Sequence, residues 1–307
     1  MIIHLKSIYS FKQLGNRESQ EDSRYPDSDS PNIEEYAFLV CDGIGGCDDG
    51  LLASSTVSSC IGSLLSSHKN TNKFTEEDFS NIINHAFKSL DDVSSKFNTN
   101  LGTTLSFVAI HRGGIFTAHI GDSRIYQIRP GEGIMYRSED HSLVNALLRS
   151  GNISPDEISG HPKRNIIIRS MFSKSGTSDK DNPTVLNIKN IDPGDYFLLC
   201  SDGVIDKITD EDLIALYSSS LSDENKLRQL SKICKESSDN NTAIQICIEQ
   251  IDKEAEDNIS DESFEEKEPC VNTEQITNDD EDSVHELPLT IENNQSKIRT
   301  ILSRLFQ

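Results

Sequence analysis

Short apolar or alternating runs recur through the first 248 residues of this 307-residue chain. Each run is four to eight residues long and is bounded by glycine, proline, aspartate or other turn formers, which is typical of β-strands. Four consecutive runs are joined by Arg-Gly-Gly, Gly-Asp-Ser and Pro-Gly-Glu-Gly, so we expect them to form one antiparallel meander. The predicted strands span residues 36–41, 104–111, 115–120, 124–129, 134–137, 196–200 and 242–248.

Longer segments between these runs repeat apolar residues with a period near 3.6, which predicts amphipathic helices. Thr75 and Thr209 each precede an acidic residue by three positions, which is the spacing of a capping box at the start of a helix. The grouping of antiparallel strands and separate helices favours an α+β fold. The predicted helices span residues 49–66, 76–93, 210–217 and 221–236.

The apolar pattern ends after residue 248, which we take as the end of the folded domain, 1–248. Residues 249–286 carry 16 acidic and 2 basic side chains. We expect 249–293 to be a disordered acidic linker, because it cannot bury enough apolar area to offset chain entropy. Residues 294–307 differ and predict a short amphipathic helix with a basic face. Its apolar residues are Ile298, Ile301, Leu302 and Leu305, and its basic residues are Lys297, Arg299 and Arg304.

The net charge of −22 argues against nucleic acids and anionic lipid surfaces as partners, since both attract basic proteins. No apolar stretch reaches the roughly 18 residues of a membrane-spanning helix, and the first residues do not resemble a signal peptide. The seven cysteines are odd in number and form no CxxC pair, which favours reduced thiols. We therefore expect a cytoplasmic protein.

Four aspartates stand where predicted strands meet turns. Asp42 and Asp202 follow apolar runs, Asp239 precedes one, and Asp22 lies in a polar turn before the first. Converging carboxylates repel one another unless cations compensate them. Mg²⁺ and Mn²⁺ prefer oxygen ligands, and two such ions about 3.5–4 Å apart suit in-line attack of water on a phosphoryl group. Arg17 is a candidate for binding that phosphate, because guanidinium binds phosphate bidentately.

Each of these residues has a plainer interpretation when it is taken alone. An Asp-Gly after a strand is usually a turn, an Asp beside Asn is often a cap or Asx turn, and an exposed arginine is usually only solvated. Other phosphate-binding motifs do not match, because Asp48 stands where a dinucleotide fingerprint requires Gly or Ala and no P-loop occurs. The ordered combination of motifs, rather than any one of them, favours a phosphoryl-transfer site.

Eight ordered segments resemble the motifs of the metal-dependent Ser/Thr protein phosphatases of the PPM (type-2C) family in their compact bacterial form. The resemblance implies an α-β-β-α sandwich, in which two antiparallel β-sheets are flanked by helices. It also implies that residues 141–178 form a flap beside the site. The matching segments are GNRESQEDS at 15–23, VCDGIGG at 40–46, GTT at 102–104, AHIGDSRIY at 118–126, EDHS at 139–142, HPKRN at 161–165, LCSDG at 199–203 and DNNT at 239–242.

The resemblance implies two bound metal ions, Mn²⁺ or Mg²⁺. Asp42 would bridge both ions and the Gly43 carbonyl would bind one of them. Asp202 and Asp239 would complete the ligands of the other. Asp122 resembles the position that helps to bind a third, weaker metal.

Further roles follow from the same resemblance. Arg17 would bind the phosphate, while Asp22, with Glu21 beside it, would hold metal-bound waters. Two positions depart from the family pattern. Gln20 replaces the usual Asn, and Ile44 occupies a position where some members have His, a proposed general acid. The proton for the leaving group must therefore come from water or from another group.

We expect His141 and His161, in the flap-side motifs, to be structural. The main hypothesis is a Ser/Thr phosphatase that acts as a monomer on phosphorylated proteins and reverses the action of a cognate Ser/Thr kinase. The alternative is a weakly active regulatory module that binds a phosphoprotein. Intact metal ligands favour the first. The tail could dock a partner, fold back on the catalytic domain, or serve only as a solvated extension.

Overall fold

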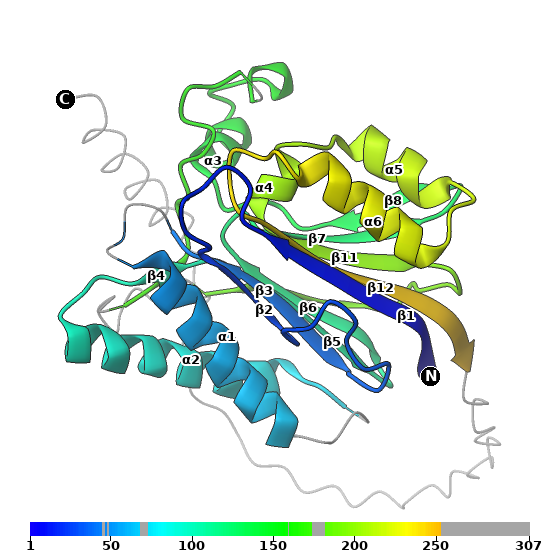
Figure 1. The fold of residues 1–307 in the computed structure, drawn as a ribbon, viewed down its shortest axis with the longest axis horizontal. Coiled ribbons are helices and arrows are strands. Elements are labelled where there is room, and N and C mark those ends of the chain that lie inside the picture. Colours follow the sequence, from blue (N-terminus) through cyan, green and yellow to red (C-terminus); the bar gives the residue numbers. More distant parts are fainter. Residues whose placement is uncertain (45–46, 48, 68–72, 159, 174–181, 253–307) are drawn as a thin grey trace, which may run out of the picture. The chain divides into compact units, whose positions relative to one another are not determined.

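Two five-stranded antiparallel β-sheets lie face to face in the computed structural model, with helices on the outer face of each (Figure 1). The structure describes residues 1–44, 47, 49–67, 73–158, 160–173 and 182–252. The first sheet contains, in spatial order, β1 (Ile2–Gln13), β12 (Asn241–Asp252), β11 (Tyr196–Cys200), β7 (Arg124–Arg129) and β8 (Gly133–Arg137). The second contains β10 (Thr184–Ile188), β6 (Gly114–Ile120), β5 (Leu105–His111), β3 (Ala37–Asp42) and β2 (Asp22–Tyr25).

Two pairs of longer helices cover the sheets. Helices α1 (Gly50–Ser67) and α2 (Glu76–Phe97) lie on the second sheet, and α5 (Asp210–Ser218) and α6 (Asp223–Cys234) lie on the first. The capping boxes predicted at Thr75 and Thr209 are present at the starts of α2 and α5. The sandwich predicted from the resemblance is therefore confirmed. The remaining elements are α3 (Leu143–Arg149), α4 (Asp202–Ile205), the 3₁₀ turn Pro155–Glu157, and the paired short strands β4 (Gly102–Thr103) and β9 (Met171–Phe172).

The central strands are apolar on both faces because both faces are covered. On β3, Phe38 and Val40 belong to the cluster between the sheets, whereas Leu39 and Cys41 belong to the cluster beneath α1 and α2. Strand side chains alternate between faces, so a strand inside a sandwich needs apolar residues at every position. This explains the unbroken apolar run at 36–41 that the sequence shows.

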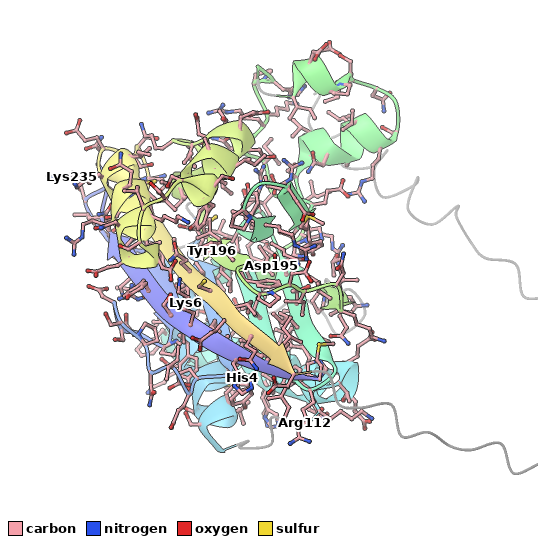
Figure 2. All side chains as sticks on the ribbon, turned by 90° about the vertical axis from the view of Figure 1, so that its right-hand side faces the viewer. His4, Lys6, Arg112, Asp195, Tyr196 and Lys235 are labelled. Atoms are coloured by element: carbon pink, nitrogen blue, oxygen red, sulfur yellow. The ribbon has the colours of Figure 1, made fainter. Side chains whose placement is uncertain are left out.

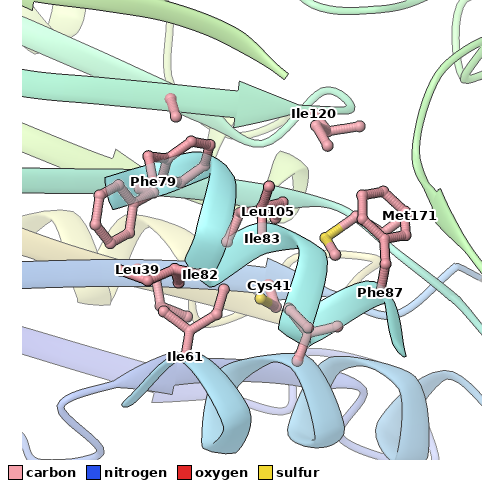
Figure 3. Packing of buried hydrophobic residues seen from close by; sticks show 14 of the residues in the cluster. Leu39, Cys41, Ile61, Phe79, Ile82, Ile83, Phe87, Leu105, Ile120 and Met171 are labelled. Carbon is pink, nitrogen blue, oxygen red and sulfur yellow. The ribbon is translucent and has the colours of Figure 1, made fainter. Parts of the chain in front are cut away.

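Packing beneath α2 fixes the second sheet against its helices. Figure 3 shows Phe79 and Ile83 of α2 directed at the sheet, with Ile61 of α1 beside them. Phe79 lies 5.1 Å from the ring of Phe107 on β5, measured between centroids. Burial of each such side chain contributes about 1.5–3 kcal/mol. This core packing fixes the C-terminal end of β3 and the N-terminal end of β5. Both ends lie next to the site described below.

The predicted meander is wrong at its middle turn. Strands β5 and β6 form the expected hairpin, and so do β7 and β8, but β6 belongs to one sheet and β7 to the other. The turn at 121–123 therefore crosses between the sheets. Gly121 makes the crossing with φ +108°, and a Cβ there would lie 2.6 Å from the Thr104 side chain. Periodicity alone could not separate a hairpin turn from this crossing.

Strands β1, β2, β4, β9 and β10 are absent from the sequence prediction, and β12 is longer than predicted. Strand β1 was not predicted, since register shifts at His4/Leu5 and Leu5/Ser7 break its alternation. Strand β12 pairs with β1 and continues to Asp252, four residues beyond the boundary placed at residue 248. The predicted linker beyond Asp252 and the predicted helix at 294–307 lie outside the described residues. In the part of the chain that is described, none of the helices has the length and apolar character needed to cross a bilayer.

Candidate active site

One cavity of about 210 Å³ gathers most of the predicted site residues at the end of the sandwich where β3 and β11 finish. Elements that are distant in sequence contribute to it: the loop before β2, the end of β3, the crossing turn, the start of α4 and the turn before β12. Asp22 lies beneath the cavity and is fully buried. The predicted residues lining the cavity are Arg17, Glu21, Asp42, Gly43, Asp122, Asp202 and Asp239.

The backbone around Asp42 is fixed on three sides. Asp22 and Asp42 are cross-strand partners in the β2–β3 ladder. The Asp42 carbonyl accepts bonds from the Thr104 N–H (2.8 Å) and the Thr103 hydroxyl (2.8 Å), and the Asp42 N–H donates to the Thr104 hydroxyl (3.0 Å). At the next residue, a Cβ on Gly43 would lie 2.4 Å from the Gly50 carbonyl oxygen. Glycine is therefore required where β3 meets α1.

Asp202 is placed by a similar close approach. It opens the four-residue helix α4 directly after Ser201, whose hydroxyl donates to Asp22 Oδ2 (2.8 Å). A Cβ on Gly203 would lie 2.0 Å from the Asn240 carbonyl oxygen, so only glycine lets α4 approach the turn that carries Asp239. In both Asp-Gly pairs the glycine allows a close backbone approach that places the preceding aspartate at the cavity.

Burial and mutual repulsion disfavour the charged forms of these carboxylates. Burial raises the pKa of Asp42 and of Asp202 well above the usual value, and the surrounding carboxylates add to the effect. Burial likewise raises the pKa of Asp22 to about 6 and that of Asp122 to about 7. Such shifts mark a place where the protein's own cations do not compensate its carboxylates.

Three buried carboxylate oxygens in this group lack hydrogen-bond partners, namely Oδ1 of Asp22, Asp122 and Asp202. Buried unpaired oxygens of this kind are costly and suit a hard divalent cation. As the side chains are placed, no three His, Cys, Asp or Glu residues of the described ranges already surround one point as a metal ion would require. The fit to a cation therefore rests on the shared cavity, the unpartnered oxygens and the all-oxygen donor set.

Arg17 reaches the same cavity from its rim. Its guanidinium pairs with Asp239 at 2.6 Å, and its side chain is 51% exposed. Arg17, which the sequence predicts to bind phosphate, therefore lies at the cavity, where it contacts a predicted metal ligand. Glu21 accepts a bond from the Ser19 hydroxyl at 3.1 Å.

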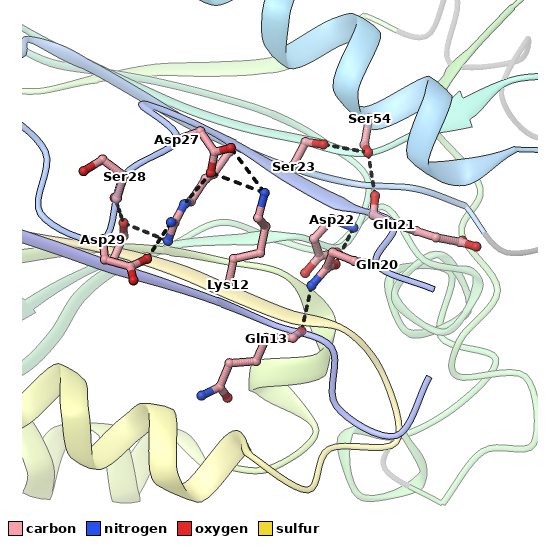
Figure 4. A network of polar contacts seen from close by, with 12 residues as sticks. Lys12, Gln13, Gln20, Glu21, Asp22, Ser23, Asp27, Ser28, Asp29 and Ser54 are labelled. Carbon is pink, nitrogen blue, oxygen red and sulfur yellow. Dashed lines mark hydrogen bonds and ion pairs between the residues drawn. The ribbon is translucent and has the colours of Figure 1, made fainter. Parts of the chain in front are cut away.

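Two polar side chains hold the loop that carries Arg17 and Glu21, and their roles were not foreseen from the sequence. Asn240 accepts from the Glu21 N–H (2.7 Å) and donates to the Leu14 and Ser19 carbonyls. Gln20 donates to the Gln13 carbonyl (2.9 Å) and accepts from the Asp22 N–H (2.8 Å), as Figure 4 shows. Gln20, which replaces the Asn usual in the family, thus bonds this loop to β1.

His141 anchors the crossing turn, consistent with the structural role expected for it. The backbone N–H of His141 donates to the Gly121 carbonyl (2.8 Å), and the ring Nδ1 of His141 accepts from the backbone N–H of Gly121 (3.1 Å). Its Nε2 lies 2.9 Å from the Thr184 hydroxyl, and its ring stacks on His119 at 4.5 Å. His141 therefore fixes the residue directly before Asp122. His161 is outside the cavity lining, where its Nδ1 accepts from the Lys163 N–H.

Comparisons with known proteins agree with this geometry. A model of the family described as Protein phosphatase 2C matches residues 28–235. Protein phosphatase PhpP of Streptococcus pneumoniae is 32% identical over 186 residues, which cover 60% of this chain and 73% of the relative. Serine/threonine protein phosphatase PstP of Mycobacterium tuberculosis is 36% identical over 114 residues, which cover 37% of this chain and 21% of PstP.

Solved structures show the same fold. Serine/threonine phosphatase Stp1 from Staphylococcus aureus superposes with a TM-score of 0.65 at 27% identity, covering 81% of this chain and 98% of Stp1. The catalytic domain of PstP, solved in complex with two manganese ions, gives a TM-score of 0.65 at 23% identity over 81% of this chain and all of that domain. The family match covers well over half of the chain, and the matching relatives are enzymes of one class. The chain therefore belongs to the protein phosphatase 2C family and is a bacterial-type serine/threonine protein phosphatase.

Proposed function

We propose that the cavity around Asp42 is a divalent-metal centre at which phosphoserine and phosphothreonine in proteins are hydrolysed. In this proposal two ions, Mn²⁺ or Mg²⁺, are held by Asp42 between them, by the Gly43 carbonyl, and by Asp202 and Asp239. The observation that carries the proposal is the set of buried, unpartnered oxygens of Asp22, Asp122 and Asp202 around one cavity. Bound divalent ions supply positive charge for the phosphoryl oxygens and an activated water.

The remaining carboxylates complete the centre. Glu21 and Asp22 hold water ligands by accepting their hydrogen bonds, and the Ser201 hydroxyl keeps Asp22 oriented for this. Asp122 holds a third, weaker ion at the crossing turn. This assignment agrees with the unpaired Oδ1 of Asp122 and with its raised pKa of about 7, since a nearby cation would favour the charged form.

Arg17 binds two phosphoryl oxygens through its planar guanidinium. Its Nη2 contacts Asp239, and both residues line the cavity. Binding of cations at Asp239 would weaken the ion pair and free the guanidinium. In this proposal Arg17 binds the phosphate when the metal ions are bound, and it neutralises the charge of Asp239 when they are not.

The leaving serine or threonine oxygen must receive a proton. Ile44 lines the cavity and has no proton to donate. We propose that a solvent molecule protonates this oxygen. The rate for a phosphoserine peptide should then depend more on leaving-group basicity than it would with an internal acid.

The test is hydrolysis of p-nitrophenyl phosphate with and without Mn²⁺ by the full chain. Asp42→Ala and Asp202→Ala should abolish turnover, while Asp92→Ala, an exposed aspartate on α2, should match the wild type. Calorimetric titration with Mn²⁺ gives an independent readout, and both site variants should bind fewer ions. Wild-type protein without Mn²⁺-dependent turnover, or equal turnover in Asp42→Ala, would refute the proposal. Phosphoprotein binding without turnover would instead favour the regulatory module.

We further propose a cytoplasmic monomer that opposes a cognate Ser/Thr kinase. Support comes from five described cysteines that are free thiols: Cys41, Cys60, Cys200, Cys234 and Cys247. For the segment after Asp252 we keep the proposal that it docks a partner or modulates access to the site. A chain ending at Asp252 with unchanged kinetics and unchanged partner capture would rule out both roles.

A further inference from the structure

A bond between two buried hydroxyl groups joins distant segments of the chain at the cavity around Asp42. Thr104 directly precedes β5 and lines the cavity, whereas Ser123 lies in the crossing turn, next to Asp122. Their Oγ atoms are 2.7 Å apart, and each side chain is only 1% exposed. A hydrogen bond is stronger in a water-poor interior than in solvent, so this one can hold the two segments together.

Thr104 is tied to Asp42 on its other side. Its backbone N–H donates to the Asp42 carbonyl (2.8 Å), and its hydroxyl oxygen accepts from the Asp42 N–H (3.0 Å). A hydroxyl has one hydrogen and two lone pairs, so Thr104 can bond Asp42 and Ser123 at the same time. One oxygen atom thus lies between the backbone of Asp42 and the side chain of Ser123.

The Thr104 side chain contacts both neighbours of Asp122. Its hydroxyl bonds Ser123, and its methyl group lies against Gly121, where a Cβ would come within 2.6 Å of the methyl carbon. Oδ1 of Asp122 has no hydrogen-bond partner. The position of this carboxylate therefore follows that of the turn on either side of it, which Thr104 helps to hold.

The volume of Ser123 does not explain its hydroxyl. Alanine would leave out only the oxygen, and Thr104 would keep its bonds to Asp42. Pairing two buried hydroxyls adds little net stability, because each first loses its bonds to water. A hydrogen bond adds what apolar contact lacks, which is a preferred distance and direction between Asp42 and the turn that carries Asp122.

We propose that Ser123, through its bond to Thr104, is a positioning residue that sets Asp122 against Asp42 and thereby sets the affinity for the ion at Asp122. The inference rests on the proposed function, because it matters only if Asp122 holds that ion. Small divalent ions need closely defined ligand geometry, and residues that orient a ligand typically change metal affinity by roughly 10- to 100-fold. Ions held by Asp202 and Asp239 should depend less on the crossing turn.

The first test is calorimetric titration of the full chain with Mn²⁺. Ser123→Ala should weaken binding of the weaker ion about tenfold, and the tighter ions should lose less affinity. The Mn²⁺ concentration that half-activates hydrolysis of p-nitrophenyl phosphate should rise by the same factor. A loss shared equally by all ions would mean that Ser123 supports the site as a whole, and the proposal would be overturned.

Ser94→Ala on α2 is the matched control. Ser94 is fully buried and outside the cavity lining, and its hydroxyl donates to the Thr99 carbonyl (2.6 Å). Each substitution removes one buried hydroxyl and its bond, so the unfolding temperatures without metal should fall by similar amounts. Only Ser123→Ala should change Mn²⁺ binding. If Ser94→Ala weakens it to the same extent, the effect is a general loss of stability and the proposal fails.

Variants at Thr104 test whether the bond itself matters. Thr104→Ser keeps the hydroxyl and should retain most of the affinity for the weaker ion, whereas Thr104→Val should lose at least as much as Ser123→Ala. In the Thr104→Val background, Ser123→Ala should have no further effect, because the bond is already absent. A full further loss there would show that Ser123 acts without Thr104, contrary to the proposal.

The behaviour of the wild type separates this inference from the proposed function. A wild type without Mn²⁺-dependent turnover would refute the proposed function. Two other results would leave the two-metal centre in place and overturn the role of Ser123. One is Mn²⁺-dependent turnover with no weaker ion in the titration, and the other is a weaker ion that Ser123→Ala binds as tightly as the wild type does.

Discussion

Two buried groups of charged side chains in this fold differ in how far their charges are compensated. One lies at α6 and the other in the active site. Beneath α6, Asp223 accepts bonds from the Tyr196 hydroxyl (2.6 Å), the Ser7 hydroxyl (3.0 Å) and Lys6 Nζ (3.0 Å). Lys226 donates to the Tyr196 hydroxyl at 3.0 Å and completes what we call the α6 cluster. Figure 2 labels Lys6 on β1 and Tyr196 on the same sheet. In this cluster the Asp223 carboxylate has Lys6 and two hydroxyl donors around it, whereas burial lowers the pKa of Lys226.

The carboxylates of the active site have no such balance. Asp22, Asp42, Asp122 and Asp202 repel one another, and the arginine that reaches the cavity pairs with Asp239 instead. Burial raises the pKa values at the active site, whereas in the α6 cluster hydrogen bonds and Lys6 outweigh the effect of burial and lower the pKa of Asp223. A fold gains nothing from unbalanced buried charge, so the contrast points to a ligand that completes the site. The α6 cluster, by contrast, stabilises the fold by itself.

The largest expected effect is at the unbalanced site. Asp202→Asn should lower Mn²⁺-dependent kcat/KM about 10³-fold, because a lost metal ligand removes several kcal/mol of transition-state stabilisation. In metal-free protein the same variant should unfold at a higher temperature than wild type, since it removes one of several repelling charges. Steady-state kinetics and calorimetry measure the two effects. A metal-free variant less stable than wild type would mean that Asp202 is already balanced.

The sequence predicted the fold class, and the residues that it predicts for the site gather around one cavity. The Asp-Gly pairs at 42 and 202 were visible because a tight turn after an apolar strand leaves a local signature. The placement of Asp122 between two sheets was not visible, because a crossing turn and a hairpin turn use the same residues. Asn240 bonds the backbone of Glu21, 219 positions away, and His141 bonds that of Gly121, which is separated from it by β7 and β8, so only the folded chain shows such partners.

The next largest effect is expected at the balanced site. Asp223→Ala should lower the free energy of unfolding by about 2–3 kcal/mol, because it removes hydrogen bonds to a buried charged group and leaves Lys226 without the carboxylate. Activity per folded molecule should stay unchanged. Asp252→Ala is the matched control, since its pair with His4 is exposed and contributes little. Urea unfolding measures the difference, and equal midpoints for the two variants would contradict it.

A smaller effect is expected at the anchor of the crossing turn. His141→Leu removes the Nδ1 acceptor that holds the Gly121 N–H, so Asp122 should be less well placed and Mn²⁺ activation should weaken about tenfold. In His141→Asn, the amide oxygen can lie where Nδ1 lies and should restore most of the activation. Calorimetric Mn²⁺ binding should follow the same order. If both variants lose activation equally while remaining folded, the acceptor is not what matters.

The smallest effect, and the sharpest contrast, is the sign of the pH dependence of stability. The pKa of Asp223 is lowered on folding, so its stabilisation is present above the usual aspartate pKa of about 4 and is lost as pH falls. The pKa values of Asp22 and Asp122 are raised to about 6 and about 7, so their ionisation opposes folding increasingly as pH rises from about 4 to 7.

Metal-free wild type should therefore unfold at a lower temperature at pH 7 than at pH 5. Asp122→Asn should flatten this decline, because it removes one of the buried carboxylates whose pKa is raised on folding. Saturating Mn²⁺ should abolish it, because a bound cation favours the charged carboxylates in the folded state. Asp223→Asn should leave the decline intact and lower stability above about pH 4, and its difference from wild type should shrink as pH falls further and the wild-type carboxylate loses its charge. A metal-free protein whose stability rises from pH 5 to 7 would show that the active-site carboxylates are balanced like those of the α6 cluster.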